Sequence, residues 1–171
     1  SYCIIPYTRG RIRSKNPEEV IEEVKNLAAQ GYKEIVLTGI HLSSYGKDLG
    51  DITLLDVIQR IQQIEDIERI RLGSLEPRII TEQFVKELRA CDKVCPHFHL
   101  SLQSGCDETL KRMNRKYTTE EYETALNVLR TYYEHPALTT DVIAGFVGET
   151  EEEFEKTRAY LEKINLYEMH I

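Results

Sequence analysis

Four cysteines, at positions 3, 91, 95 and 106, are the residues of this 171-residue chain best suited to metal or redox chemistry. Thiolates bind iron–sulfur clusters, whereas a disulfide framework is typical of small secreted chains. No secretory signal opens the sequence, and no apolar run approaches the roughly 18 residues that span a bilayer. We therefore expect a cytoplasmic protein whose cysteines are metal ligands, catalytic groups or buried thiols.

Glycine, hydroxyl and amide residues recur where predicted strands end. They occupy four stretches, at 38–39, 73–77, 103–105 and 145–149. Glycine lets a ligand approach the backbone closely, and a few convergent polar groups orient ligands in most binding sites. The glycines could instead only turn the chain, but the same composition at four consecutive strand ends favours a site for a polar ligand.

Alternating helices and strands must position these residues. Capping residues and apolar spacing predict helices at 17–30, 54–64, 81–88, 119–132 and 150–164. Short apolar and β-branched runs predict strands at 34–39, 69–75, 97–103, 138–144 and 167–171. This order predicts one α/β domain with a parallel sheet, either an incomplete barrel or an open doubly wound sheet. In both folds the carboxyl ends of the strands carry the site.

Five groups of sequence strings, in order along almost the whole chain, resemble the tRNA methylthiotransferases, a family of radical S-adenosylmethionine (SAM) enzymes. They are residues 1–11, 37–41, 72–77, 102–105 with 110–115, and 140–150. The resemblance implies a partial (β/α) TIM-like barrel of the radical SAM type. It further implies that residues 1–171 are an incomplete core domain, without its first strand, the amino-terminal methylthiotransferase domain and the carboxyl-terminal RNA-binding domain.

The resemblance also implies two cofactors, a 4Fe–4S cluster and S-adenosylmethionine. In the family a C-x3-C-x2-C loop leaves one iron open to chelate SAM, and an electron from a donor then yields a 5′-deoxyadenosyl radical. Cys3 corresponds to the third cysteine of that loop. A single thiolate cannot hold such a cluster, so we expect this chain alone to be inactive. Cys91 and Cys95 fall at the opposite end of the sheet, and we expect them and Cys106 to be ordinary thiols.

Ten residues match positions that bind SAM in the family. They are Tyr2, Thr38, Gly39, Ser74, Glu76, Gln103, Ser104, Arg115, Ile143 and Gly145. The resemblance implies that Thr38 and Gly39 bind the methionine amino group and that Ile143, Gly145 and the Tyr2 ring lie near the adenine. Ser74, Glu76, Gln103 and Ser104 could hydrogen-bond the ribose or the methionyl group. Arg115 could hold the methionine carboxylate bidentately, whereas Arg112 could simply solvate its helix.

The implied reaction adds a methylthio group to a modified adenosine in tRNA. The strings at 38–41 and 73–77 look most like the threonylcarbamoyladenosine branch, whereas sister branches act on isopentenyladenosine or on a ribosomal protein. The alternative from another class is a non-catalytic, cofactor-binding α/β scaffold.

The charge of the chain bears on its partners. The net charge is −7, with basic clusters only at 9–15 and 111–116, so we expect another domain to supply much of the grip on tRNA. A missing first strand would expose a sheet edge and favour self-association of the chain.

Overall fold

The computed structural model describes residues 3–171, and it contains every predicted strand, each with shorter bounds. The strands are β1 (Glu34–Leu37), β2 (Arg69–Leu72), β3 (His97–His99), β4 (Ala137–Asp141) and β5 (Glu168–His170). The long helices are α2 (Pro17–Ala29), α3 (Leu54–Gln62), α4 (Glu82–Arg89), α6 (Thr119–Tyr132) and α7 (Glu151–Ile164). Shorter pieces are α1 (Ile5–Arg9), α5 (Asp107–Arg112) and the 3₁₀ turns η1 (Leu42–Ser44) and η2 (Pro77–Ile79).

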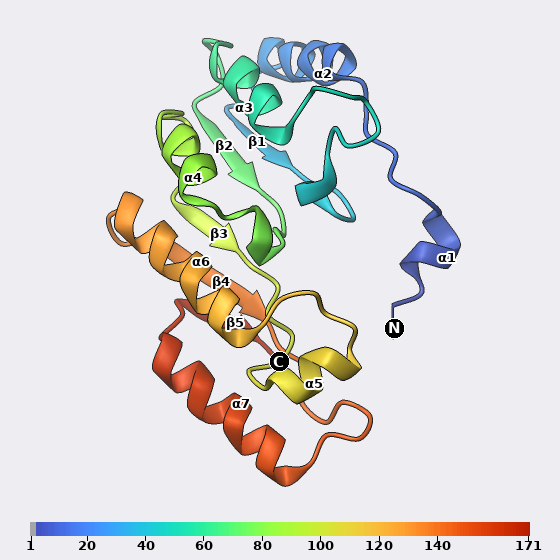
Figure 1. Ribbon diagram of the computed structural model, residues 1–171. Helices are drawn as coiled ribbons and strands as arrows, with labels where there is room; N and C mark the ends of the chain where they lie inside the picture. The colour runs from blue at the N-terminus through green and yellow to red at the C-terminus, as the bar shows by residue number, and fades with distance from the viewer. Residues whose placement is uncertain (1–2) are drawn as a thin grey trace.

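The order of the strands decides between the two folds that the sequence allows. β1 pairs with β2, and β3 with β4 and then β5, all in parallel. Isolated parallel bridges from Ile70 to Val94 and from Leu75 to Leu100 join the two groups. Neighbours in space are therefore neighbours in sequence, without the reversal of strand order that defines a doubly wound sheet. The structure is a partial TIM-like barrel, and that part of the prediction is confirmed (Figure 1).

The two faces of the curved row of strands differ in chemistry. The long helices line its outer side (Figure 1), where Ile70, Leu72, Phe98 and Leu138 are at most 2% exposed. Alternate residues of a strand point to opposite faces, so the residues between these lie on the inner face. In a closed barrel, layers of bulky apolar side chains fill this space. Here the inner face is mostly polar, with Val36 and Ala137 as its apolar members. The polar residues are Glu34, Arg69, Arg71, His97, His99, Thr139, Asp141, Glu168 and His170.

Local capping explains where the long helices begin. The Asn16 side chain accepts a hydrogen bond from the Glu18 backbone N–H, as the sequence predicts for the start of α2. Thr53, Thr118 and Thr150 each form a reciprocal capping box with an acidic residue three positions later. The helix α1 has no counterpart in the sequence prediction. None of its five residues is buried, and it stands apart from the strands (Figure 1).

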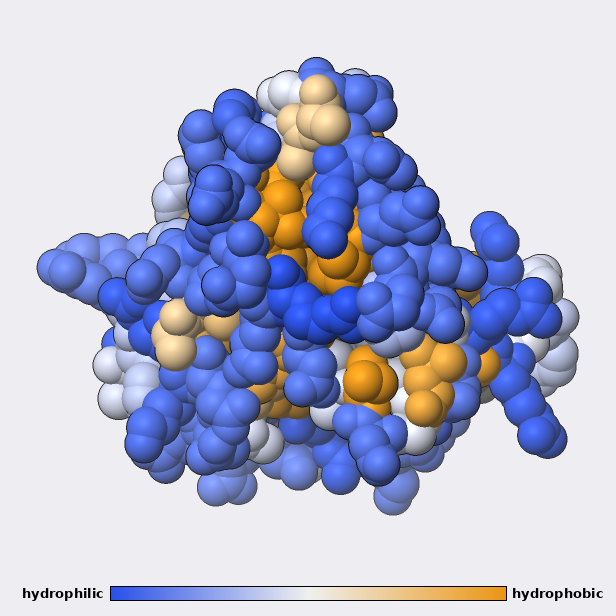
Figure 2. Space-filling view, turned by 90° about the horizontal axis from the view of Figure 1, so that it is seen from above, coloured by the Kyte–Doolittle hydropathy of each residue, from blue (hydrophilic) through white to orange (hydrophobic). Residues whose placement is uncertain are grey.

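Figure 2 shows the surface of the molecule from above the view of Figure 1, and this surface is mostly hydrophilic. Apolar residues show there in smaller areas between charged side chains (Figure 2). Within residues 3–171, no helix combines the length and the apolar character needed to cross a membrane.

Gly46 lies where the segment between β1 and α3 folds back tightly on itself, and its φ of +87° suits glycine. A Cβ atom there would lie 1.7 Å from the Ile52 carbonyl oxygen. We expect Gly46→Ala to destabilise the protein by about 3 kcal/mol, since it adds a backbone clash to the strained φ. Gly50 is the matched control, because it has a φ of +92° but open space around the added Cβ. Gly50→Ala should cost only about 1 kcal/mol, and equal losses in urea unfolding would contradict the steric account.

Candidate active site

The structure brings eight of the predicted site residues to one edge, the carboxyl ends of the first four strands. They are Thr38 and Gly39 after β1, Ser74 and Glu76 after β2, Gln103 and Ser104 after β3, and Ile143 and Gly145 after β4. Backbone hydrogen bonds join neighbouring segments along this edge. The Gly73 N–H donates to Leu37 (2.8 Å), and the Ile143 N–H donates to Gln103 (2.8 Å).

A small polar network ties the segments after β1 and β2 together. The His41 Nε2 atom lies 3.3 Å from Glu76 Oε2, and the Ser44 hydroxyl lies 2.5 Å from His41 Nδ1. The Glu76 backbone N–H donates to the Ser43 hydroxyl at 2.9 Å. One oxygen of the half-buried Glu76 carboxylate is thus oriented by His41. The sequence analysis did not single out His41, although it sits in the string that follows β1.

The segment after β3 presses against α7. The Ser104 side chain is fully buried, and its hydroxyl lies 3.1 Å from the Thr157 hydroxyl. At Gly105, an added Cβ would come within 2.9 Å of Tyr160 and 3.0 Å of the Thr157 Cα atom, so only glycine allows this approach. Gln103 has a φ of +72° and is 9% exposed. The Ser104 hydroxyl therefore fastens the loop to α7, and the SAM-binding role of both side chains stays a prediction.

Three buried hydroxyls add to the backbone hydrogen bonds that hold the segment after β3. Tyr122 donates to the Leu100 carbonyl (2.9 Å), and Tyr117 donates to the Leu102 carbonyl (3.0 Å). The Thr140 hydroxyl donates to Leu100 (2.6 Å) and accepts from the Leu102 N–H (2.9 Å). Burial raises the pKa of Tyr122 to about 12, which keeps its phenol neutral and able to donate. β3 ends four residues before the predicted end, and these contacts hold the chain from there to Gln103.

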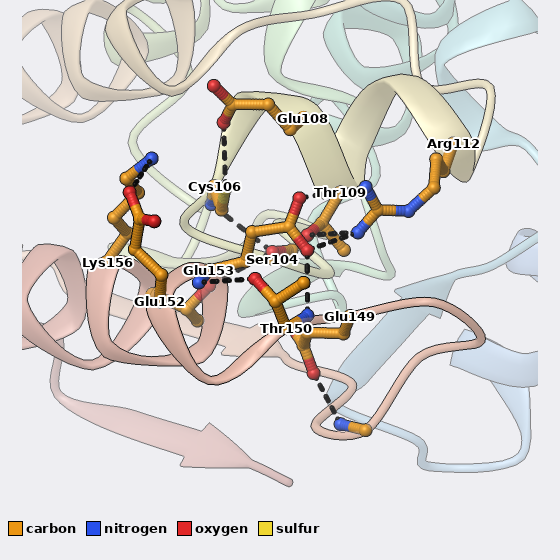
Figure 3. Close-up of polar contacts among 12 residues, drawn as sticks. Ser104, Cys106, Glu108, Thr109, Arg112, Glu149, Thr150, Glu152, Glu153 and Lys156 are labelled. Carbon is orange, nitrogen blue, oxygen red and sulfur yellow. Dashed lines mark hydrogen bonds and ion pairs between the residues drawn. The ribbon is translucent and has the colours of Figure 1, made fainter.

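An ion pair joins α5 to the start of α7. The Arg112 guanidinium donates to both carboxylate oxygens of Glu153, at 2.8 and 2.5 Å, and to the Thr109 hydroxyl (Figure 3). The Thr150 backbone N–H also donates to Glu153 at 2.9 Å. Arg112, with the Thr150 backbone second, lowers the pKa of Glu153 to about 2. The Arg112 guanidinium is therefore held by an ion pair and a hydroxyl. The sequence had suggested that it could simply be solvated on its helix.

A second acidic residue, Glu149, closes the loop that follows β4. Its Oε2 atom accepts from the Gly145 backbone N–H at 2.5 Å, where Gly145 has a φ of +73° (Figure 3). The other carboxylate oxygen, Oε1, is buried and has no hydrogen-bond partner among the described residues. A buried unpaired acceptor calls for a donor from a ligand or water, so this loop fits a polar ligand. Glu149 was not among the predicted site residues, although it lies in the string at 140–150 that carries the resemblance.

The remaining predicted site residues are not gathered at this edge by the described contacts. Tyr2 lies outside the described residues, and Cys3 is exposed just before α1. Arg115 is half-buried, three residues beyond the end of α5.

The four cysteines do not form a cluster site by themselves. Burial raises the pKa of the Cys91 and Cys106 thiols, and Cys91 lies at the amino end of β3. Within residues 3–171, no three His, Cys, Asp or Glu side chains are grouped to hold a metal ion. The described residues therefore do not fit a 4Fe–4S cluster without further ligands.

The Glu153 carboxylate should make stability depend on pH. Because its pKa is lowered from 4.5 to about 2, its contribution is complete above pH 4.5 and is lost as the pH falls towards 2. We expect Glu153→Gln to unfold at lower urea concentration near neutral pH and to approach the wild type at the acid end. Glu152→Gln is the matched control, because Glu152 is exposed and its ion-pair partner among the described residues is Lys156, which is also exposed. A difference between wild type and Glu153→Gln that is constant with pH would contradict the lowered pKa.

Comparisons with known proteins agree with this fold. Residues 1–161 match the model of the radical SAM superfamily. The chain is 48% identical to a tRNA-2-methylthio-N(6)-dimethylallyladenosine synthase of a Thermoanaerobacter species, over 96% of this chain and 35% of that protein. It is 45% identical to the synthase of the same name from Dictyoglomus thermophilum, over 96% of this chain and 37% of that protein. The chain thus spans about a third of the length of these relatives.

Solved structures show the same fold at low sequence identity. A radical S-adenosylmethionine methyltransferase from Kitasatospora setae, with cobalamin and a 4Fe–4S cluster bound, aligns with a TM-score of 0.71 and 18% identity, over 91% of this chain and 30% of that one. Coproporphyrinogen III oxidase from Escherichia coli, a radical SAM enzyme, aligns with a TM-score of 0.64 and 17% identity, over 90% of this chain and 37% of that one. The parallel partial barrel, its polar strand ends and the match over residues 1–161 lead to one conclusion: the chain belongs to the radical SAM superfamily.

Proposed function

We propose that this chain is the core of a radical SAM enzyme that transfers a methylthio group to a modified adenosine in tRNA. The observation that carries the proposal is the joint position of Thr38, Ser74, Gln103 and Gly145 at one polar edge of a partial barrel. The relatives named for methylthiolation of a tRNA adenosine support this reaction, since they match the chain over nearly its whole length.

The strand-end segments would bind SAM, which supplies an adenosyl radical and a methyl group when it is bound. Thr38 and Gly39 are both exposed, so their hydroxyl and backbone carbonyl groups are accessible to the methionine amino group. Glu76, oriented by His41, offers an acceptor to the ribose or methionyl group. Ile143 and the Gly145 loop, closed by Glu149, offer an apolar side chain and bare backbone to the adenine. Cys3 would supply one thiolate of a 4Fe–4S cluster, with the other ligands outside the described residues.

Other parts of a longer protein would complete the enzyme. The relatives are about three times as long as this chain, and the chain itself carries a net charge of −7. Binding of the tRNA phosphates needs a basic surface, so further segments would supply most of the contact with RNA. An electron donor and a cytoplasmic setting belong to the same proposal.

The modified adenosine has two candidates that differ in physical character. The names of the relatives favour dimethylallyladenosine, whose N6 substituent is apolar. The strings at 38–41 and 73–77 favour threonylcarbamoyladenosine, whose substituent carries a carboxylate and needs a cationic or donor partner. Both nucleosides are N6-monosubstituted adenosines, and we propose this shared class as the substrate.

Anaerobic reconstitution of the full-length protein that carries this sequence tests the function. We expect a reduced 4Fe–4S signal in electron paramagnetic resonance that changes when SAM is added. We also expect a methylthio nucleoside in digests of tRNA that carries one of the two modified adenosines. A protein that binds the cluster and SAM but leaves both tRNAs unmodified would contradict the substrate class. A protein that binds SAM but no cluster would leave only the non-catalytic, cofactor-binding scaffold.

A substitution of Arg115 tests the proposed contacts with SAM, independently of the reaction on tRNA. If its guanidinium holds the methionine carboxylate, Arg115→Ala should raise the Kd for SAM by about tenfold or more, because a charged hydrogen bond is worth about 1.5–3 kcal/mol. Lys116→Ala is the matched control, as it removes an adjacent exposed cation and should leave the Kd within about twofold. Calorimetry of SAM binding to the full-length protein gives both Kd values. Equal effects of Arg115→Ala and Lys116→Ala would refute a specific role for Arg115.

A further inference from the structure

The inner face of the sheet carries a continuous hydrogen-bonded unit beside the strand ends. His99 on β3 pairs in register with Thr139 on β4, and its Nδ1 atom lies 3.0 Å from the Thr139 hydroxyl. On the other side of the ring, Nε2 lies 3.2 Å from Asp141 Oδ2. An imidazole held at both nitrogens has a fixed orientation, and it fixes in turn the carboxylate that it contacts.

Asp141 stands where this unit meets the candidate site. Its backbone carbonyl accepts from the Gln103 N–H at 2.9 Å, and Ile143 follows it by two residues on the same side of the chain. Asp141 is the last residue of β4, and the residues that would bind the adenine of SAM, Ile143 and Gly145, follow it closely in the chain. A substrate that enters from the inner face of the partial barrel would lie close to this carboxylate.

The Asp141 carboxylate has an open acceptor. Its side chain is 50% exposed, whereas the His99 side chain is 16% exposed. Oδ2 is held by His99, and Oδ1 has no hydrogen-bond partner within residues 3–171. By contrast, the Glu34 carboxylate on β1 is shared by Arg69 (2.7 Å) and Arg71 (3.0 Å), so both of its oxygens are taken. Asp141 is thus an inner-face carboxylate with one oxygen oriented and the other open to a donor.

We propose that Asp141, oriented by His99, binds the substrate nucleobase by accepting a hydrogen bond from the N–H at N6 of the modified adenosine. The inference rests on the proposed function for the class of substrate. A carboxylate can only accept, so its partner must be a donor, and an N6-monosubstituted adenine has one N–H on that edge. The contact would place the purine ring against the inner face, with the cofactor at the strand ends above it. Asp141 is a binding residue in this proposal, and His99 is a positioning residue.

Equilibrium binding of short RNA to the full-length protein tests the proposal without turnover. The probes are four RNA hairpins that differ in one loop nucleotide: unmodified adenosine, N6-isopentenyladenosine, N6-threonylcarbamoyladenosine and N6,N6-dimethyladenosine, which lacks the N–H. We expect the wild type to bind at least one monosubstituted hairpin about tenfold more tightly than the dimethylated one, the size expected for a hydrogen bond to a charged group. Asp141→Asn should reduce this ratio to within about threefold, because it replaces the charged acceptor by a neutral amide.

Two further variants separate a specific contact from a loss of structure. Asp92→Asn makes the same chemical change on a 92% exposed side chain at the amino end of β3, and it should keep the wild-type ratio. His99→Gln should lower the ratio part of the way, since the carboxylate stays but loses its fixed orientation.

The outcomes also separate this inference from the proposed function. A wild type that binds the monosubstituted hairpins no better than one with plain adenosine would contradict the substrate class. If the wild type prefers a monosubstituted hairpin but Asp141→Asn keeps the full ratio, the substrate class stands and the role of Asp141 is wrong. Because further segments would supply most of the contact with RNA, a collapsed site would also lose the ratio. An unchanged Kd for SAM shows that the strand ends of Asp141→Asn are intact, and a Kd for SAM that is lost together with the ratio would mean a damaged site and not a lost contact.

Discussion

The arrangement of the site depends on how the chain leaves β3. This strand pairs over only three residues, and the segment 100–103 then runs under the site through the protein interior. Buried backbone groups need partners, and the hydroxyls of Tyr117, Tyr122 and Thr140 supply them. Without these hydroxyls the buried carbonyls would be unpaired, at a cost of about 1–3 kcal/mol each. The same contacts set where Gln103 and Ser104 stand, so the site is built from helix side chains as much as from the sheet.

The alternation of side chains across the strands explains why this sheet can carry a site on its face as well as at its edge. Outward residues such as Phe98 and Leu138 are buried under helices and supply the hydrophobic stabilisation. Inward residues are mostly polar, and the polar ones are tolerated because most of them are paired, as Glu34 is with Arg71 and His99 with Asp141. His97 is an exception, as its Nδ1 atom is buried without a partner among the described residues. Burial, followed by the charge of Arg71, lowers the pKa of His97, which keeps its ring neutral in this position.

The sequence predicted the elements well because their signals are local. Apolar spacing predicted α6 at the bounds that the structure shows, although the sequence pointed to Thr119 as its cap and the structure has Thr118 there. The strand-end stretches of the sequence contain seven of the eight predicted site residues that lie at this edge. What could not be predicted depends on contacts between distant segments. The pairing of Arg112 with Glu153 spans 41 residues, and the contact between His99 and Asp141 spans 42. The path of the chain after β3 also depends on distant hydroxyls, whereas the run 97–103 by itself looks like a full strand.

The position of Cys3 sets a different constraint on the site. The strand-end segments are fastened by Ser104 to α7, by Glu149 to Gly145 and by His41 to Glu76, so their shape is present without a ligand. Cys3 precedes a helix of five residues that buries none of its side chains. So short a helix is not stable by itself in water. If Cys3 ligates a cluster at the strand ends, as we propose, the groups that bind there would also have to hold this segment in place. Part of their binding free energy would be spent on folding it, as is common where metal binding and folding are coupled.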